Sequence, residues 1–220
     1  MPSIPSFRPP IVLGVLVSGE GRTMEGLGTA IAQGRLAARI NRVVSDRERA
    51  PAVERARRQG WPVEVIAPGR LDREAWAGAI TRSLEAAGVE LVVLAGFLRV
   101  LPASWVARWA GRAVNLHPSL LPAYGGPGLY GLKVQEAVIA DGVRETGATV
   151  HWVTGDVDRG PILGQRRIAT RPGETASELA DRLRPVEIAL LVDVVNDLAL
   201  GRLNSGGAEP PRDGAGPPAA

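Results

Sequence analysis

The chain has 220 residues, of which 45% are hydrophobic and 22% charged, a composition typical of a soluble globular protein with one substantial core. Its 26 Lys and Arg against 23 Asp and Glu leave a formal charge of only +3, which disfavours a nucleic-acid partner because such proteins concentrate basic residues on one surface. The absence of cysteine and the presence of only two histidines exclude disulfides, thiolate chemistry and a His-rich metal site, so we expect no metal.

The two ends of the chain differ in composition from the part between them. No stretch approaches the roughly 18 to 20 apolar residues of a membrane span, and the Pro-rich start does not resemble a signal peptide. We therefore expect a cytoplasmic protein without a membrane partner. Residues 1–10 are predicted to be a flexible lead, residues 11–203 one domain, and residues 204–220, rich in Pro, Gly and Ala, a disordered tail.

Apolar strands alternate with helices through the first half of the domain. The expected strands are Ile11–Val17, Ile40–Val44, Val63–Ile66, Leu91–Ala95 and Ala113–Leu116. The expected helices are Thr23–Gln33, Ala52–Gln59, Arg73–Ala87 and a short helix after Pro102. Strands that are apolar on both faces and alternate with helices indicate a parallel sheet with right-handed crossovers.

The pattern changes after Pro122. A helix over Leu132–Ala140 precedes two expected strands, Thr146–Val153 and Ile162–Ile168, and a long helix over Ala176–Leu200 closes the domain. The connection between the two strands is too short for a crossover, so they should pair antiparallel. We predict a single-domain α/β fold whose mostly parallel twisted sheet has a Rossmann-like N-terminal half and an antiparallel strand pair in the C-terminal half.

A glycine-rich turn, SGEGRT from Ser18 to Thr23, stands where the first strand ends and a helix begins. Glycines allow close backbone approach, and a helix N-terminus offers free N–H groups and partial positive charge, which together favour phosphate binding; a plain tight turn is the alternative. The turn is a poor dinucleotide fingerprint because Met24 occupies the third glycine position. Asp46 is interpreted as a cap of the next helix rather than a ribose-binding acid.

Asn115 and His117 carry the clearest local signal of chemistry. Strand alternation places both side chains on one face, at the carboxyl end of a strand, where open α/β sheets bind ligands. An amide and an imidazole together suit a reaction in which a carbonyl oxygen gains negative charge, since one donor holds the oxygen while the other also moves protons. The alternative is a capped strand end whose histidine bonds its own loop.

The loop between the two last strands offers two carboxylates, Asp156 and Asp158. A carboxylate beside His117 would raise the imidazole pKa and fix its tautomer, although Asp in a hairpin loop is usually only a turn former. His151 is interpreted as a packed or edge histidine rather than a second catalytic one. The tryptophans and Met24 are interpreted as core or interface residues.

These segments together resemble one family. A Ser-Gly-x-Gly turn, VVLAGFLRVL from Val92, NLHPSLLP from Asn115 and TGATVHWVTGDVDRGPIL from Thr146 occur in that order. The chain resembles the folate-dependent formyltransferase family, and within it phosphoribosylglycinamide formyltransferase, over about Ile11 to Leu203. The resemblance implies transfer of the formyl group of 10-formyltetrahydrofolate, as cosubstrate, to the amine of glycinamide ribonucleotide in purine biosynthesis.

The resemblance also implies roles for individual residues. Asn115, His117 and Asp158 would be catalytic, the first two stabilising the oxyanion of a tetrahedral intermediate and Asp158 orienting His117 and keeping its pKa elevated. Folate contacts would fall on Arg73, Leu98, Arg99, Val100, Leu101, Thr154, Gly155, Asp156 and Val157. The ribonucleotide would contact Gly21, Arg22, Thr23 and Glu187.

The sequence departs from the family pattern on the nucleotide side. Arg22 and Thr23 replace the usual Ser and Asn, Arg184 stands where Gln is usual, and Ile188 where His is common. Formyl transfer to another amine, such as an amino-sugar nucleotide, therefore stays open. A non-catalytic nucleotide-binding module is the rival from another class. Transfer to methionyl-tRNA and deformylation are disfavoured because the chain offers no room for the extra domains of those enzymes. A monomer or a homodimer is expected.

Overall fold

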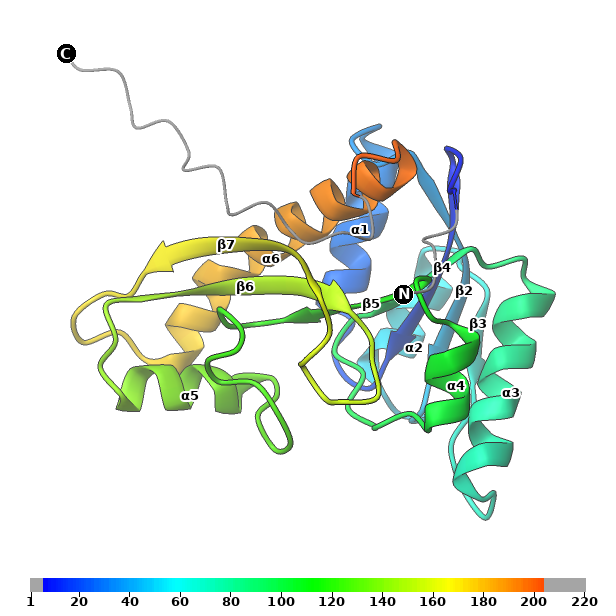
Figure 1. The fold of residues 1–220 in the computed structure, drawn as a ribbon, viewed down its shortest axis with the longest axis horizontal. Coiled ribbons are helices and arrows are strands. Elements are labelled where there is room, and N and C mark those ends of the chain that lie inside the picture. Colours follow the sequence, from blue (N-terminus) through cyan, green and yellow to red (C-terminus); the bar gives the residue numbers. More distant parts are fainter. Residues whose placement is uncertain (1–5, 204–220) are drawn as a thin grey trace.

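The computed structural model describes residues 6–203, which form one seven-stranded sheet with helices on both faces (Figure 1). The strands are β1 Ile11–Val17, β2 Ala38–Ser45, β3 Val63–Val65, β4 Leu91–Leu94, β5 Ala113–His117, β6 Glu145–Trp152 and β7 Ile162–Ala169. Their order is β3-β2-β1-β4-β5-β6-β7. The first five pair in parallel, whereas β5–β6 and β6–β7 pair antiparallel. The predicted fold class is confirmed.

The helices follow the predicted order and differ from it only at their ends. They are α1 Arg22–Ala32, α2 Pro51–Arg58, α3 Arg73–Ala86, α4 Ala103–Arg108, α5 Leu132–Ala140 and α6 Ala176–Ala199. Helix α1 begins one residue earlier than predicted. Strand β2 begins at Ala38 rather than Ile40 because its first two residues pair with β1, which the apolar run alone did not indicate. These shifts leave the topology unchanged.

Each face of the sheet has its own hydrophobic core. Side chains from α1, α2 and α6 pack with Leu13 and Val15 of β1 on one face. Side chains from α3 and α4 pack with Leu16 on the other, where Trp105 and Trp109 are almost fully buried. The apolar run of β1 therefore serves two cores, as its lack of polar residues predicts.

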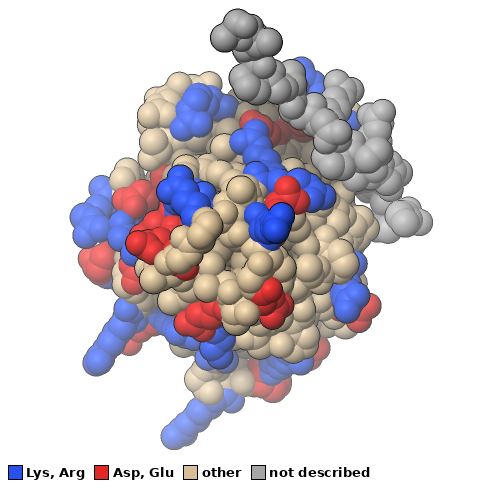
Figure 2. Space-filling model, turned by 90° about the vertical axis from the view of Figure 1, so that its left-hand side faces the viewer, with Lys and Arg blue, Asp and Glu red and all other residues tan. Residues whose placement is uncertain are grey.

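The segments at the two ends are described only in part. Within the predicted flexible lead, the structure describes residues 6–10 and buries Phe7 against the α1 and α6 side of the core. The predicted disordered tail, 204–220, lies outside the described residues. Among residues 6–203, no helix is both long and apolar enough to cross a membrane. Basic and acidic side chains are interspersed on the face that Figure 2 presents.

Neighbouring strand ends are bonded to one another at the carboxyl edge of the sheet. Ser18, after β1, accepts a hydrogen bond at Oγ from the N–H of Leu98, and its own N–H donates to the carbonyl of Gly96, after β4. The turn that begins α1 and the loop that follows β4 are therefore held side by side. This edge carries the cavity described next.

Candidate active site

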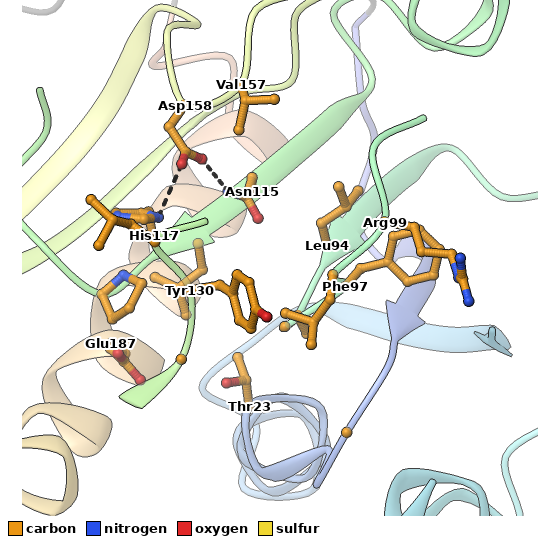
Figure 3. A pocket seen from close by; sticks show the side chains of 18 of the residues that line it. Thr23, Leu94, Phe97, Arg99, Asn115, His117, Tyr130, Val157, Asp158 and Glu187 are labelled. Carbon is orange, nitrogen blue, oxygen red and sulfur yellow. Dashed lines mark hydrogen bonds and ion pairs between the residues drawn. The ribbon is translucent and has the colours of Figure 1, made fainter. Parts of the chain in front are cut away.

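A cavity of about 760 Å³ opens at the carboxyl ends of β1, β4 and β5 (Figure 3). It is lined by residues 19–23, 94–101, 115–118, 126–132 and 153–158, by one stripe of α6, and by Val106, Gln135 and His151. Four of the six exposed large hydrophobic side chains in the described part of the chain belong to this lining: Leu98, Val100, Tyr130 and Leu132. Exposed apolar groups gathered at one cavity indicate a ligand site rather than ordinary surface.

The polar centre of the cavity combines side chains from β5, β6 and the β6–β7 loop. Asn115 Nδ2 lies 3.3 Å from Asp158 Oδ1, and His117 Nδ1 lies 3.5 Å from Asp158 Oδ2. Figure 3 shows the Asp158 carboxylate pointing toward both side chains. His151 joins them, with Nε2 3.1 Å from Asn115 Nδ2 and 3.6 Å from Asp158 Oδ1. We call these four residues, for which a catalytic role is proposed below, the catalytic cluster.

Hydrogen-bond partners define the orientation of groups in the cluster. His151 Nδ1 donates to the carbonyl of Trp152, so in the neutral ring Nε2 is an acceptor and receives a hydrogen from Asn115. The second amide hydrogen of Asn115 points at Asp158. Since both amide hydrogens have partners, Asn115 can stabilise an oxyanion only by exchanging one of these bonds, and the 3.3 Å bond to Asp158 is the longer.

The pKa values of the cluster follow from burial and mutual charge. Burial lowers the pKa of His117 below its usual 6.5, and the opposing attraction of Asp158 and the Tyr124 carbonyl does not offset it. Burial by itself would raise the pKa of Asp158, but the adjacent His151 ring, a hydrogen bond from the Gly126 N–H and the charge of His117 together bring it below its ordinary value. The expectation that Asp158 leaves His117 with an elevated pKa is therefore wrong, because desolvation dominates.

The loop that precedes α5 is attached to the catalytic cluster. The Tyr124 carbonyl accepts a hydrogen bond from His117 Nε2 at 2.8 Å, and the Gly126 N–H donates to Asp158 Oδ2 at 3.0 Å. Both Tyr124 and Asp158 have a positive φ of 55°, a left-handed conformation that is uncommon outside glycine. Such outliers persist where surrounding structure determines them, and here they aim a carbonyl and a carboxylate at one ring.

His151 is the member of this cluster that sequence reasoning missed. It is buried, with its side chain 3% exposed, but its Nε2 faces the cavity centre rather than the core. The signal lay in strand pairing: β5 and β6 are antiparallel and place His151 directly opposite Asn115. Directly opposed residues share one face of a sheet, so recognising that pairing would have placed His151 beside Asn115 and His117.

The segment after β4 forms the apolar end of the cavity. Residues 98–101 and 154–157, which were predicted to contact folate, all line the cavity. Among the described residues 6–203, those that line the cavity do not include Arg73, which stands at the start of α3. Its side chain donates two hydrogen bonds, of 2.8 and 3.2 Å, to the Val100 carbonyl. Arg73 therefore supports this segment.

Asp46 has a different role from the predicted one. Its buried carboxylate accepts a 2.7 Å hydrogen bond from Arg99 Nε, and within residues 6–203 no side chain caps α2, which starts after Ala50. The helix-cap interpretation is wrong because the carboxylate points to the segment after β4 instead. Asp46 thereby fixes one side of Arg99, which borders the cavity.

The opposite end of the cavity is built from two helices. Gly21 precedes α1 with φ of 73°, and within the described residues no side chain caps α1, so its first N–H groups are free for a ligand. Arg22 and Thr23 line the cavity here, as does Arg184 of α6. Burial raises the pKa of Glu187, also on α6, to about 7, an effect that the Arg184 charge opposes.

Comparison with known proteins agrees with this geometry. A family model described as formyl transferase matches residues 12–195. The chain belongs to this formyltransferase family. It is 32% identical to the phosphoribosylglycinamide formyltransferase of Escherichia coli over 190 residues, covering 86% of this chain and 87% of that protein. The solved structure of the phosphoribosylglycinamide formyltransferase of Coxiella burnetii has 34% identity, covers 90% of this chain and 91% of its own, and has a TM-score of 0.83.

Other relatives are longer than this chain. The chloroplastic phosphoribosylglycinamide formyltransferase of Vigna unguiculata is 35% identical over 192 residues, which cover 87% of this chain. The chain spans only 62% of the length of that protein. Family membership therefore applies to the domain that carries the cavity and the catalytic cluster.

Proposed function

We propose that the protein transfers the formyl group of 10-formyltetrahydrofolate to the amine of glycinamide ribonucleotide. The observation that carries this proposal is a single cavity lined by the catalytic cluster, by the exposed apolar side chains of Leu98 and Val100, and by the uncapped start of α1. A flat folate ring suits the apolar end, and a phosphorylated amine suits the end where α1 begins. The relatives named above, each called phosphoribosylglycinamide formyltransferase, support the same substrates.

The reaction joins the amine to the formyl carbon. The nitrogen lone pair attacks that carbon, the carbonyl electrons move to oxygen, and a tetrahedral intermediate forms. The bond from carbon to the folate nitrogen then breaks, a proton reaches that nitrogen, and the amine nitrogen loses one. Deformylated folate and the formamide are the products, so atoms and charge balance.

His117 is suited to the proton transfers because of its lowered pKa. Near pH 7 the ring is mostly neutral and can accept a proton from the attacking amine. Asp158, 3.5 Å away, stabilises the imidazolium that forms, which then delivers the proton toward the folate nitrogen. Asn115 stabilises the oxyanion once it releases Asp158, and His151 keeps the amide in position.

The predicted binding contacts are part of the same proposal. Backbone groups of residues 98–101 and 154–157 border the apolar end and are placed to bond a flat, amide-rich ring. Gly21, Arg22 and Thr23 border the end assigned to phosphate, and Glu187 lines the same cavity as a partner for ribose hydroxyls. Arg73 acts on folate through Val100 in this proposal.

A spectrophotometric assay tests the proposed function. A 10-formyl folate analogue is mixed with the enzyme and, in separate runs, with glycinamide ribonucleotide or an amino-sugar nucleotide. We expect acceptor-dependent deformylation with glycinamide ribonucleotide, reduced about a thousandfold in His117→Ala. Turnover only with the amino-sugar nucleotide would reassign the acceptor, and no acceptor-dependent turnover would refute the enzymatic proposal.

Three further expectations belong to the proposal. The protein is expected to act in the cytoplasm, as a monomer or homodimer and without nucleic acid. Size-exclusion chromatography with light scattering measures the oligomeric state, and a larger assembly would contradict that part.

A further inference from the structure

Three charged side chains meet at the end of the cavity assigned to phosphate. Arg184 Nη1 lies 2.8 Å from Asp181 Oδ1, and Arg22 Nη1 lies 3.9 Å from the same oxygen. Arg22 belongs to α1, whereas Asp181 and Arg184 belong to α6, and all three line the cavity. One carboxylate oxygen therefore faces guanidinium groups from two helices. We call these three residues the arginine–aspartate bridge.

The bridge continues a stripe of cavity-lining residues on α6. Asp181, Arg184 and Glu187 are spaced three apart, which places them on one face of the helix. Arg184 thus has a carboxyl group one turn before it and another one turn after it. Of these two, Glu187 is half-buried and its pKa is raised to about 7, whereas Asp181 is the acid that lies within salt-bridge distance of both Arg22 and Arg184.

The surroundings of the bridge favour an anion. The first turn of α1 begins at Arg22 and has no side-chain cap within the described residues, so its N–H groups and partial positive charge are directed at the same end of the cavity. Two arginines add to that field, and Asp181 is the only acidic group within salt-bridge distance of both of them in residues 6–203. The carboxylate of Asp181 stands close to where the phosphate of a substrate would be held.

We propose that Asp181 competes with the substrate phosphate for Arg22 and Arg184, and so selects acceptors that carry a phosphomonoester dianion. This inference rests on the proposed function. A phosphomonoester brings close to two negative charges and three acceptor oxygens at neutral pH, which is enough to displace a single carboxylate. A diphosphate diester, with one charge on each phosphate, displaces Asp181 less well.

The contribution of Asp181 is modest in size and depends on salt. Its side chain is 62% exposed and that of Arg22 47%, and ion pairs with this exposure are weak in water. Removing the charge of Asp181 should therefore tighten phosphate binding by about three- to tenfold at low ionic strength, and by less as salt screens the site.

The test compares Asp181→Asn with Asp193→Asn. Asp193 is an exposed acid on the same helix that pairs with Arg166 outside the cavity lining, so its variant controls for the change in net charge. The dissociation constant of inorganic phosphate is measured by isothermal titration calorimetry, and the KM for glycinamide ribonucleotide is measured by the formyl-transfer assay. We expect Asp181→Asn to lower both constants three- to tenfold, Asp193→Asn to leave them within twofold, and Arg184→Ala to raise both.

Every other outcome counts against the inference. Higher constants in Asp181→Asn would show that Asp181 aligns the arginines for phosphate instead of competing with it. Unchanged constants would show that the bridge does not act on the ligand. Because phosphate binding is measured without turnover, a failed formyl-transfer assay would refute the proposed function and still leave the calorimetric result to decide the role of Asp181.

Discussion

The two functional ends of the cavity are built in opposite ways. In the catalytic cluster, three of the four side chains come from the neighbouring strands β5 and β6, and those of His117, His151 and Asp158 are between 3% and 9% exposed. In the arginine–aspartate bridge, the side chains come from helix surfaces and are between 28% and 62% exposed. The positions of the groups proposed for chemistry are therefore set mainly by strand pairing. The groups proposed to contact the acceptor substrate form ion pairs that are exposed to solvent.

The difference in exposure determines how readily each group of residues can be replaced without loss of stability. Buried polar groups must keep their partners, because an unpaired one costs about 1–3 kcal/mol. An exposed arginine or aspartate can be replaced at little cost in stability. Two of the four departures that the sequence resemblance indicated, Arg22 and Arg184, fall at this exposed end.

The largest expected effect is at His117. His117→Ala removes the group that accepts the proton and faces the oxyanion, so kcat should fall about a thousandfold. Steady-state kinetics measures the loss, and retained binding of a folate analogue shows that the cavity is intact. A loss of less than tenfold would show that the buried cluster is not the site of chemistry.

Asp158→Asn should lower kcat about a hundredfold, because it removes the charge that stabilises the imidazolium of His117. The carboxylate raises the pKa of His117 against the larger effect of burial, so the variant should have an even lower pKa there. Activity that needs neutral His117 rises with pH through this pKa. The acid limb of the pH–kcat profile should therefore move to lower pH, and a shift to higher pH would contradict this account.

Glu187→Gln should separate stability from function. The folded-state pKa is raised from 4.5 to about 7, so the protonated carboxyl favours folding at low pH, and this advantage is lost as pH rises through about 7. At about 1.4 kcal/mol per pKa unit, a rise from 4.5 to about 7 corresponds to about 3 kcal/mol, so the variant should gain about that much in free energy of unfolding at pH 8.5 and little at pH 4.5. Chemical denaturation measures this gain, and the KM for the ribonucleotide should rise at the same time. Equal stabilisation at both pH values would contradict the buried-acid explanation.

His151→Gln tests whether the histidine that sequence reasoning missed belongs to the cluster. The variant replaces the ring nitrogen that faces the Asn115 amide with a more flexible amide oxygen that holds it less firmly, so kcat should fall about tenfold while both KM values stay nearly constant. A matched His151→Ala variant should lose more, since it leaves the amide without any partner on that side. Unchanged kcat in both variants would return His151 to a purely structural role.

The smallest expected effect is at Arg73. Arg73→Ala removes two exposed hydrogen bonds to the Val100 carbonyl, so the KM for the formyl folate should rise about threefold with little change in kcat. The KM of Arg73→Lys for the formyl folate should lie between those of the unchanged protein and Arg73→Ala. A change confined to the KM for the ribonucleotide would contradict the assignment of the segment after β4 to folate.

Local periodicity was enough to predict the fold and part of the cluster. Apolar strands alternating with helices give the sheet its class, and alternation along β5 places Asn115 and His117 on one face. Asp158 could not be placed from spacing, because a hairpin loop brings it back across the sheet and only the family resemblance indicated it. His151 depended on a strand pairing between distant segments, which a single strand does not reveal.

Electrostatic environment was the least predictable property. The pKa of His117 depends on how deeply the ring is buried, and the fold alone determines that depth. Asp46 looked like a helix cap in its local context, but it pairs with Arg99, 53 residues further along the chain. The pKa values and the partners of charged residues are therefore the hardest properties to predict from sequence, because they depend on residues far apart in the chain.

The account depends most on Asp158 and His117 acting as one catalytic unit. Formyl transfer is therefore best measured in the double variant His117→Ala/Asp158→Asn beside the two single variants. We predict that the double variant falls no further than the slower single one, because the carboxylate works through the ring. A loss equal to the product of the two single losses would show that they act independently and would contradict the mechanism.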